Sequence, residues 1–543
     1  MKNILLVSPD FNPRDSRITH THFDNKWMSA IPITSIKAYM APLALATLSA
    51  LTPEDFEVDI WDEGIHGTIF ELSQLDKDYD LVGVTGYVSH MRRIRELGQM
   101  FREHKILTAA GGPDVSGSPE NYREYFDILF VGETEFVWKK FLEEWQKGNW
   151  RPEYRQVQKP PMASSPIPRW DKLAPYIKNY AIAAVQTTRG CPYDCNYCDV
   201  VYNYGRTPRH KSVEQVLEEV SVLEKLGAGS IFFCDDNFMG QPKYTKELLR
   251  ELISVNRQFR RQLCFTTQIT LNVAQDDELL QLLADANFTS MFIGVETPNE
   301  ESLKAANNGH NLQGDISESI RKIQSYGIVP EAGIMVGFDE DDTSIFKRQL
   351  RFAQESGIDP ATINTLKAPP GTKLWYQMHA ENRVVRPRGV SDYEWEIGSD
   401  VLTNILPKNM TQAELISGCT WLIENVRDWK NFGERAKVTL SRMPSREPAR
   451  KEHLAGNPLR LLRGVPKAVV RLATMDAKNR SAAVFFARNM ILKHPTMLIR
   501  MSKFANSERR EEISQIARQQ LGLDDVSGYV EPIEALRFFF SID

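Results

Sequence analysis

Short runs of hydrophobic residues alternate with segments of helical periodicity along the first 145 residues. The run Asn3–Val7 comes first, and a helical pattern follows at Ala41–Leu51. Strands separated by helices form βαβ units, which build a parallel sheet covered on both faces. We therefore predict a doubly wound, Rossmann-like α/β domain at residues 1–145. Its other strands are expected at Glu57–Trp61, Leu81–Thr85, Lys105–Ala109 and Ile128–Val131.

A second series of the same kind runs from Ala181 to about Val385. It contains six hydrophobic runs separated by helical patterns such as Ser212–Leu226. Consecutive strand–helix units over about 200 residues predict a partial (βα)6 barrel of the TIM type, whose active groups lie at the carboxyl ends of the strands. These strands are expected at Ala183–Thr187, Ser230–Cys234, Cys264–Ile269, Ser290–Val295, Glu331–Val336 and Thr362–Leu366.

The rest of the chain divides into a connection and a C-terminal region. Residues 146–180 are rich in proline and are interpreted as an interdomain linker. Residues 386–543 carry mainly helical patterns and end in a basic tail: residues 441–510 hold 16 Lys and Arg against 4 Asp and Glu, although the whole chain has a net charge of −5. This asymmetry favours an anionic partner, either a membrane surface or nucleic acid. The alternative is a solvated basic helical face.

Cysteine usage and hydropathy favour a cytoplasmic protein. Six cysteines in 543 residues form no disulfide framework, which indicates a reducing compartment. The N-terminal run lacks the length and cleavage site of a signal peptide. No stretch approaches eighteen uninterrupted apolar residues, the minimum expected of a membrane-spanning helix. Membrane contact would therefore be peripheral, at the inner face, through the basic tail.

Three of the six cysteines lie close together in the stretch CPYDCNYCDV. Cys191, Cys195 and Cys198 follow the first predicted barrel strand, and thiolates bind zinc or iron–sulfur clusters. A structural zinc site needs a fourth Cys or His, and none stands at comparable spacing. A [4Fe–4S] cluster held by three thiolates leaves one iron free for a substrate or cofactor. We therefore favour the cluster over zinc, and both over cysteines that serve packing alone.

The CxxxCxxC motif, with an aromatic residue before the last cysteine, resembles the signature of the radical SAM superfamily. The resemblance covers residues 181–385. It implies that the free iron binds S-adenosylmethionine (SAM), which one electron from the cluster cleaves to methionine and a 5′-deoxyadenosyl radical. It also implies SAM-binding residues around the barrel mouth, namely Tyr197, Asp235, Asp236, Asn237, Glu296, Gly333, Val336 and Gly337.

Each of these SAM positions has an expected role from the family. The triplet Asp235–Asn237 stands where simpler members carry a GGE-type triplet that binds the SAM amine, and Glu296 ends the fourth strand, where a carboxylate reaches the ribose or amine. The stretch Gly333–Gly337 ends the fifth strand, where the backbone pairs with adenine. The acidic residues can instead serve as helix N-caps or solvated loop residues. Arg189 either screens the cluster or forms a surface ion pair.

A doubly wound domain followed by such a barrel resembles the cobalamin-dependent subfamily, whose N-terminal domain holds cobalamin over the barrel. The Asp-x-His-x-x-Gly motif that supplies a lower cobalt ligand is absent. The nearest string, DEGIHG at 62–67, has the wrong spacing, and His66 follows the wrong strand. Cobalamin without a lower His ligand is therefore expected; the alternative is a scaffold that has lost its cofactor. The expected binding residues are Ser8, Asp10, Asp62, Gly86, Tyr87, Gly111, Gly112, Pro113, Gly132 and Glu133.

Several longer segments, among them CDVVYNYGRTPRHKSVEQVLEE and FFCDDNFMG, resemble the group that contains the hopanoid C-methylases. This resemblance implies a methylase of class B, which moves a methyl group from SAM via methylcobalamin to an unactivated carbon. The substrate would be a small molecule or, given the basic tail, a lipid. Tyr202 and Tyr204 are candidates for the substrate pocket. An external electron donor of the flavodoxin or ferredoxin type is also implied, whereas a nucleic-acid partner is not expected.

Three rival functions use parts of the same machinery. The cofactor pair can serve cyclisation, ring contraction or oxidation of a porphyrin or secondary metabolite without methyl transfer. The tRNA methylthiolation enzymes carry additional N-terminal cysteines, and residues 1–190 contain none. A non-catalytic cobalamin or redox sensor would bind cofactor without cleaving SAM, which the full set of barrel motifs disfavours.

Overall fold

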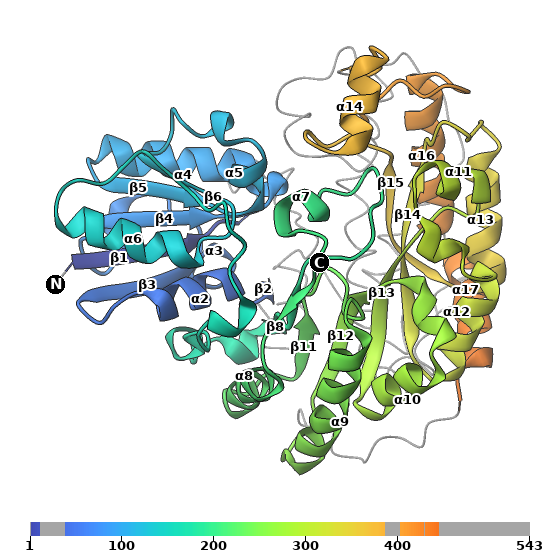
Figure 1. Ribbon diagram of the computed structural model, residues 1–543, viewed down its shortest axis with the longest axis horizontal. Coiled ribbons are helices and arrows are strands. Elements are labelled where there is room, and N and C mark those ends of the chain that lie inside the picture. Colours follow the sequence, from blue (N-terminus) through green and yellow to red (C-terminus); the bar gives the residue numbers. More distant parts are fainter. Residues whose placement is uncertain (1, 11–37, 386–401, 428, 445–543) are drawn as a thin grey trace, which may run out of the picture.

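The computed structural model describes residues 2–10, 38–385, 402–427 and 429–444. Two β-sheets lie side by side in it, each with helices packed against it (Figure 1). The first sheet has six parallel strands in the order β3-β1-β4-β5-β6-β7. Its strands are β1 (Lys2–Ser8), β3 (Phe56–Asp62), β4 (Leu81–Thr85), β5 (Leu107–Gly111), β6 (Ile128–Val131) and β7 (Glu153–Arg155).

Strand β1 shows why both faces of this sheet are covered. Ile4 and Leu6 belong to a hydrophobic core that includes residues of α2 (Leu43–Leu51) and α6 (Glu135–Gln146). Leu5 and Val7 belong to a separate core with residues of α4 (Met91–Glu103). Successive side chains of a strand point to opposite faces, so one apolar strand feeds both cores. The predicted doubly wound fold is confirmed.

The order of the strands fixes where this sheet offers a binding crevice. From β1 the chain passes to β3 on one side and then to β4 on the other. Ligands of doubly wound sheets bind at such a switch point, beyond the carboxyl ends of the strands. The residues there follow β1 and β4, and include Asp10 and Tyr87. Two short helices lie at the same edge, α3 (Glu63–His66) after β3 and α5 (Pro113–Gly117) after β5.

The proline-rich segment 146–180 is more than a connection. Its β7 is the sixth strand of the N-terminal sheet and pairs in parallel with β6. Tyr154 of β7 stacks on Phe130 of β6 with ring centroids 5.5 Å apart. Trp170 and Leu173, further along, are fully buried. A three-residue strand between prolines gives no periodic signal, so the pattern of polar and apolar residues did not predict it.

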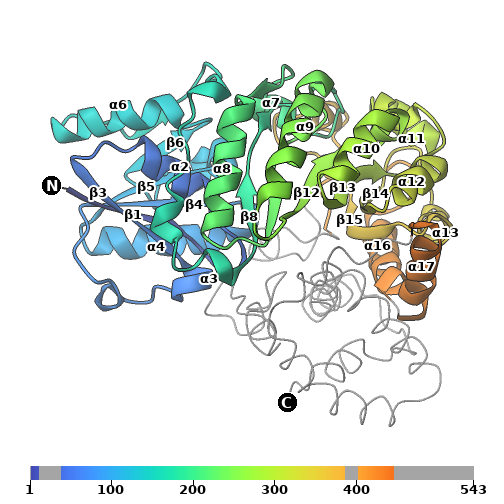
Figure 2. The ribbon, with the colours of Figure 1, turned by 90° about the horizontal axis from the view of Figure 1, so that it is seen from below.

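The second sheet contains the six predicted barrel strands in parallel, in the order β15-β14-β13-β12-β11-β8. Figure 2 shows helices α8 to α13 arranged along the outer side of this curved sheet. The strands are β8 (Tyr180–Val185), β11 (Ser230–Phe233), β12 (Cys264–Ile269), β13 (Phe288–Glu296), β14 (Val329–Val336) and β15 (Asp359–Thr365). The helices are α8 (Val213–Lys225), α9 (Pro242–Gln258), α10 (Asp277–Asp285), α11 (Glu300–Ala305), α12 (Ile316–Ser325) and α13 (Ile345–Ser356).

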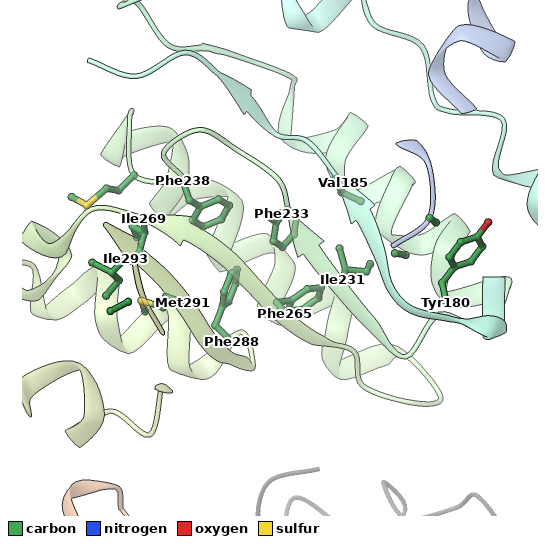
Figure 3. Packing of buried hydrophobic residues seen from close by; sticks show 14 of the residues in the cluster. Tyr180, Val185, Ile231, Phe233, Phe238, Phe265, Ile269, Phe288, Met291 and Ile293 are labelled. Atoms are coloured by element: carbon green, nitrogen blue, oxygen red, sulfur yellow. The ribbon is translucent and has the colours of Figure 1, made fainter. Parts of the chain in front are cut away.

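Aromatic side chains form the centre of the barrel core. Phe233, Phe265 and Phe288 come from three neighbouring strands, and their ring centroids lie 5.4 to 5.7 Å apart (Figure 3). All three rings are fully buried. Offset aromatic contacts at this distance add to the free energy gained by burial. The predicted partial barrel is confirmed.

The barrel sheet has a seventh strand that comes from the N-terminal region. Strand β2 (Ala38–Met40) pairs in parallel with β8, with Ala38 opposite Tyr180 and Met40 opposite Ile182. The backbone N–H of Ala41 continues the pairing by donating to the carbonyl of Ile182 at 3.2 Å. A segment from the first domain thus covers the edge of the second domain's sheet.

The C-terminal region contains helices α14 (Lys373–Ala380), α16 (Gln412–Arg427) and α17 (Trp429–Arg442). Helix α16 lies against α13 and β15. The prediction of a basic tail falls almost entirely on residues 445–543, which lie outside the described residues. Among the helices that the structure describes, none combines the length and apolar character needed to cross a membrane.

Candidate active site

The three cysteines lie on a closed loop at the carboxyl end of β8. Strand β9 (Thr188–Arg189) enters the loop and β10 (Arg209–His210) leaves it, and the two pair in antiparallel fashion. The N–H of Cys191 donates to the carbonyl of Gly205 at 3.2 Å. Gly190 has φ +102°, and a Cβ there would lie 2.9 Å from that carbonyl oxygen. Only glycine therefore allows the neck of this loop to close.

The thiols are partly buried and near one another. Burial raises the pKa of Cys191, and it raises the pKa of Cys195 and Cys198 to about 12. Cys195 has Cys191 among its titratable neighbours, and Cys198 has both other cysteines. Without a metal centre the thiols stay protonated, whereas bound metal makes them thiolates. No set of three His, Cys, Asp or Glu among the described residues is arranged around a single metal ion. Three neighbouring thiols on one loop suit a larger group, an iron–sulfur cluster.

Helices and turns that follow other barrel strands hold this loop. The N–H of Asn196 donates to the carbonyl of Ala306, the residue after α11, and its carbonyl accepts from the N–H of Leu374 at the start of α14, at 3.1 and 2.8 Å. The hydroxyl of Tyr193 accepts a hydrogen bond from Asn272 at 2.9 Å, and its ring lies 4.2 Å from that of His310. The cysteine loop is therefore fixed before any cofactor binds.

The triplet after β11 divides into two kinds of residue. The carboxylate of Asp235 is fully buried and accepts hydrogen bonds from Thr187 and Thr188, including the Thr187 N–H at 2.7 Å. It therefore shapes the chain that leads to the cysteines. Asp236 and Asn237 lie beside the loop itself: Asp236 accepts from the Gly190 N–H at 2.6 Å, and Nδ2 of Asn237 lies 4.0 Å from Sγ of Cys191.

Asp236 also has an altered acidity. Burial raises the pKa of its carboxyl to about 6, although the hydrogen bond from the Gly190 N–H lowers it. A buried carboxylate with one donor is well suited to accept further hydrogen bonds from a cationic group such as an amine. Of the three predicted positions, Asp236 and Asn237 are the ones placed to meet a ligand at the cysteines.

Glu296 occupies a strained position at the end of β13. Its φ is +64°, a left-handed conformation that costs free energy for any residue other than glycine. The register with β14 shifts at this point, and Gln349 donates to the Glu296 carbonyl at 3.0 Å. Burial raises the pKa of the carboxyl to about 7, and a hydrogen bond with the Tyr197 side chain lowers it. Strain kept in place by its surroundings is typical of functional sites.

Tyr197, predicted as a SAM contact, lies between Glu296 and the cysteines. Its hydroxyl accepts a hydrogen bond from Nδ2 of Asn308 at 2.9 Å. Cys195 and Cys198 both stand among the groups that influence its pKa, which burial raises. The structure thus brings Tyr197, Glu296 and the cysteine loop together.

Backbone groups at the glycine-containing end of β14 already have hydrogen-bond partners within the protein. The N–H of Gly337 donates to the carboxylate of Asp341 at 3.0 Å, and the carbonyl of Val336 accepts from the N–H of Leu366 at 2.8 Å. Gly337 has φ +101°, and a Cβ there would lie 2.6 Å from a methyl carbon of Leu415. Adenine contacts at Gly333, Val336 and Gly337 remain a prediction, and the Gly337 N–H would have to leave Asp341 to make one.

Two of the predicted cobalamin residues contact the barrel instead of facing an open space. The carboxylate of Asp62 accepts a hydrogen bond from the Tyr180 hydroxyl at 2.8 Å and from the Gly64 N–H at 2.9 Å. Burial raises the pKa of Asp62 to about 6. Glu133 forms ion pairs with Arg189 at 2.6 Å and Arg209 at 2.7 Å. Arg189 therefore forms an ion pair between the two domains. Neither predicted role, screening of the cluster or a surface ion pair, included this contact.

Tyr87, at the switch point of the N-terminal sheet, faces the barrel. Tyr87 is 57% exposed to solvent, yet burial raises the pKa of its hydroxyl, and its titratable neighbours are Cys234 and Asp236 directly after β11. Solvent reaches the Tyr87 side chain although protein atoms surround it. We therefore place this side chain in the space between the two domains. The ring of His90 lies 6.2 Å from that of Tyr87, and His90 Nδ1 accepts the Tyr87 N–H.

The remaining predicted loops lie at the same edge. The N–H of Asp10 donates to the carboxylate of Glu63 at 2.9 Å. Gly112 has φ +106°, and a Cβ there would lie 2.6 Å from Oγ1 of Thr85. His66 bonds through Nδ1 to the backbone of Asp62 and packs against Tyr176, so its role is local. Also at this edge are Ser8, which ends β1, Gly86 after β4, Gly111 and Pro113 on either side of the β5–α5 turn, and Gly132 after β6.

The two tyrosines proposed for the substrate pocket lie on α7 (Val200–Tyr204), directly after the cysteines. Tyr202 is 44% exposed, whereas burial raises the pKa of Tyr204, which has Tyr87 and Asp236 among its titratable neighbours. Tyr204 therefore lies between the domains, and Tyr202 lies on the surface. The sequence analysis missed two sets of residues. Glu135 and Arg209 form ion pairs with Arg189 and Glu133. Asn308 and His310 contact the tyrosines of the cysteine loop.

The fold and the site define a partial barrel of parallel strands with three neighbouring thiols on its first loop. Residues 185–352 match the Radical SAM superfamily. An uncharacterized methyltransferase of Synechocystis sp. is 31% identical over 68% of this chain and 68% of its own length. The hopanoid C-2 methylase of Rhodopseudomonas palustris is 33% identical over 64% of this chain and 66% of its own length. The chain belongs to the radical SAM superfamily.

Solved structures of low sequence identity share the fold. The cobalamin-dependent SAM radical enzyme OxsB, with aqua-cobalamin and SAM bound, superimposes with a TM-score of 0.60 at 16% identity; the match covers 100% of this chain and 84% of OxsB. The radical SAM methyltransferase TsrM from Kitasatospora setae, with cobalamin and a [4Fe–4S] cluster bound, gives 0.56 at 16% identity and covers 96% of this chain and 100% of TsrM. The match extends over both sheets, which confirms the predicted fold class.

Proposed function

We propose that this protein is a cobalamin-dependent radical SAM enzyme that transfers a methyl group from SAM to an unactivated carbon. The observation that carries the proposal is the position of the cysteine loop, which faces the carboxyl edge of a separate doubly wound domain. The names of the two relatives, a methyltransferase and a hopanoid methylase, support methyl transfer. The two solved structures of similar fold, both with cobalamin bound, support a corrinoid between the domains.

The barrel residues would hold the cluster and SAM. When bound, the reduced cluster supplies the electron that cleaves SAM, and cobalamin supplies the methyl group. Cys191, Cys195 and Cys198 bind iron. Asp236 and Asn237 accept and orient the amine of SAM beside Cys191, and Glu296 holds the ribose or amine from the opposite strand. The support of Glu296 by Tyr197 keeps its carboxylate directed at the barrel mouth.

The N-terminal residues would hold cobalamin. Tyr87 offers an aromatic face between the domains, and the turns after β1, β4 and β5 offer backbone groups at the switch point. Asp62 and Glu133 have a different role, because their contacts with Tyr180, Arg189 and Arg209 fix the domain onto the barrel. Closure of the two domains over the site excludes water, which protects a reactive radical from side reactions.

The substrate is proposed to be a lipid, and a comparison of lipid extracts tests this. Extracts from a host with the gene, without it, and with Cys198→Ala would be analysed by mass spectrometry. We expect a lipid heavier by one methylene in the first host alone. If no lipid changes, the lipid proposal is wrong, and bacteriochlorophyllide-like tetrapyrroles become the next class to assay, since a methyltransferase of such a molecule is 24% identical to this chain.

A second candidate function uses the same cofactors without methyl transfer. An anaerobic magnesium-protoporphyrin IX monomethyl ester cyclase is 22% identical over 54% of this chain. The two functions differ in what they make from SAM. Methyl transfer gives S-adenosylhomocysteine and 5′-deoxyadenosine in similar amounts, whereas the second function gives only 5′-deoxyadenosine. Liquid chromatography of the reaction products with the active substrate separates them.

The proposed partners are an external flavodoxin- or ferredoxin-like electron donor and, through the basic tail, an anionic membrane surface. Flotation with liposomes of phosphatidylglycerol and phosphatidylcholine tests the membrane contact. We expect the full chain to float and a variant without residues 445–543 to stay in solution. Failure of the full chain to float would exclude the membrane contact, and with it the main argument for a lipid.

A further inference from the structure

A group of five charged side chains, four of them largely buried, joins the two domains beside the cysteine loop. Glu133 follows β6 of the N-terminal sheet, and Glu135 is the first residue of α6. On the barrel side, Arg189 Nη1 lies 2.6 Å from Glu133 and 2.7 Å from Glu135, and Arg209 Nη2 lies 2.7 Å from Glu133. Lys159 approaches Glu133 at 3.9 Å. We call these five residues the interdomain ion cluster.

Its central members are almost inaccessible to solvent. The side chain of Glu133 is 2% exposed, those of Arg189 and Glu135 are 12% exposed, and that of Arg209 is 16% exposed. Charges buried to this degree are retained only where each has good partners. Arg189 also donates to Gln186 at 3.0 Å, and Arg209 donates to the carbonyl of Tyr204 at 3.1 Å.

The arginines are placed where they control the cysteine loop. Arg189 and Arg209 are paired residues of β9 and β10, the two strands that form the neck of that loop. Arg189 stands two residues before Cys191. Glu133 binds Arg209 in bidentate geometry, at 2.7 and 2.9 Å, and binds Arg189 through one hydrogen bond at 2.6 Å. Because one carboxylate holds both arginines, a shift of the β6 turn moves both strands of the neck.

We propose that the interdomain ion cluster is a positioning device, which sets the place and the electrostatic surroundings of the cysteine loop relative to the carboxyl edge of the N-terminal sheet. The inference rests on the proposed iron–sulfur cluster and is independent of the substrate. Glu133 and Glu135 act through the arginines and contact no reacting atom. Their charge also balances that of Arg189 near the cluster, and reduction potentials of such clusters depend on nearby charge.

The test compares two variants of the N-terminal domain, one with two substitutions and one with a single substitution. Glu133→Gln with Glu135→Gln removes both carboxylates of the interdomain ion cluster but keeps side chains of the same size. Glu144→Gln is the matched control: Glu144 lies on α6 like Glu135, its side chain is 16% exposed, and it pairs with Arg151 and Tyr154 inside its own domain. All variants are full-length.

Hydrogen exchange of the metal-free proteins is the first readout. In the double variant, amides of residues 186–210 are expected to exchange about tenfold faster or more, while the strands β13 and β14 exchange as in the wild type. The control should match the wild type over residues 186–210. Unchanged exchange in the double variant would overturn the proposal, and so would faster exchange throughout the barrel, which indicates general loss of stability.

The reduction potential of the reconstituted cluster, followed by electron paramagnetic resonance, is the second readout. Removal of the two carboxylates should shift it to a less negative value, because positive charge near the cluster favours the reduced form. The Glu144→Gln protein should keep the wild-type potential. An equal potential in all three proteins would overturn the electrostatic part of the proposal. A wild-type protein that binds no cluster would instead contradict the proposed function, and the exchange measurement would still stand.

Discussion

The two loop edges that face each other in this protein offer different kinds of chemical groups to a ligand. At the barrel edge, side chains of specific type converge: three thiols, two carboxylates, an amide and a tyrosine, most of them partly buried and with shifted pKa values. At the edge of the N-terminal sheet the turns offer mainly glycine and backbone, and the charged side chains Asp62 and Glu133 contact the barrel. A motif can identify the first kind of edge, whereas the second must be found from its position.

The largest expected effect falls on the barrel edge. Cys198→Ala removes one of the three proposed iron ligands, so the variant should retain no stable cluster and make no 5′-deoxyadenosine from SAM. Iron analysis and chromatography of the reaction measure both. Cys264→Ser is the control, because Cys264 begins β12 at the opposite end of the barrel. A Cys198→Ala protein that still cleaved SAM would show that the trio is not the cluster site.

Glu296→Gln tests whether the strained carboxylate serves SAM. The change keeps size and removes the charge, so SAM cleavage should fall about 10- to 100-fold through the loss of a charged hydrogen bond, while the iron content stays at the wild-type level. Isothermal titration with SAM and the cleavage rate measure the effect. Wild-type affinity and rate in this variant would remove Glu296 from the SAM site and leave its φ of +64° without a functional reason.

A smaller effect is expected at the N-terminal edge. Tyr87→Ala removes an aromatic face between the domains, and binding of hydroxocobalamin should weaken about tenfold, since aromatic contacts of this kind contribute about 1 kcal/mol or more. Equilibrium dialysis followed by the corrinoid absorbance measures it. Phe70→Ala, another exposed aromatic residue of the same domain, is the control. Equal losses in both variants would mean that Tyr87 has no special place in the corrinoid site.

The last prediction concerns stability and its dependence on pH, not binding or activity. Burial raises the pKa of Asp62 from 3.8 to about 6, so the unfolded chain releases this proton at lower pH than the folded protein. Stability should therefore fall as the pH rises from about 4 to about 6, by up to about 3 kcal/mol, and stay lower above that. Urea unfolding of the metal-free protein and of Asp62→Asn at several pH values measures it, because the contribution of Asp62 is the difference between the two free energies of unfolding, and this difference should fall over that pH range.

The comparison also explains what the sequence could and could not predict. Apolar runs of four or more residues identified the barrel strands, and the spacing of Cys191, Cys195 and Cys198 identified the site. The interdomain contacts of Asp62 and Glu133 were not predictable, because they join residues 118 and 56 positions apart through the docking of two domains. Strand β2 was missed for a similar reason: three residues become a strand only when the edge of β8 is present.

The cysteine-loop neighbours show an intermediate case. The sequence predicted the three residues after β11 as equal candidates for SAM binding. The structure places Asp236 beside the cysteine loop, whereas Asp235 bonds to Thr187 and Thr188, and nothing in the triplet indicated this difference. The difference between Asp235 and Asp236 depends on the direction in which each side chain points from the end of β11. The local bend of the chain sets that direction. The same holds for Gly337, whose N–H is taken by a carboxylate four residues later.

Strand β2 has a consequence for attempts to divide the protein into modules. An unpaired edge strand is a template for aggregation, and β8 would be such an edge if residues 38–40 were absent. A barrel expressed from residue 181 onward would lack both this cover and Tyr180, the partner of Asp62. The two halves must therefore be inherited and engineered together, as one unit, although each has the architecture of an independent domain.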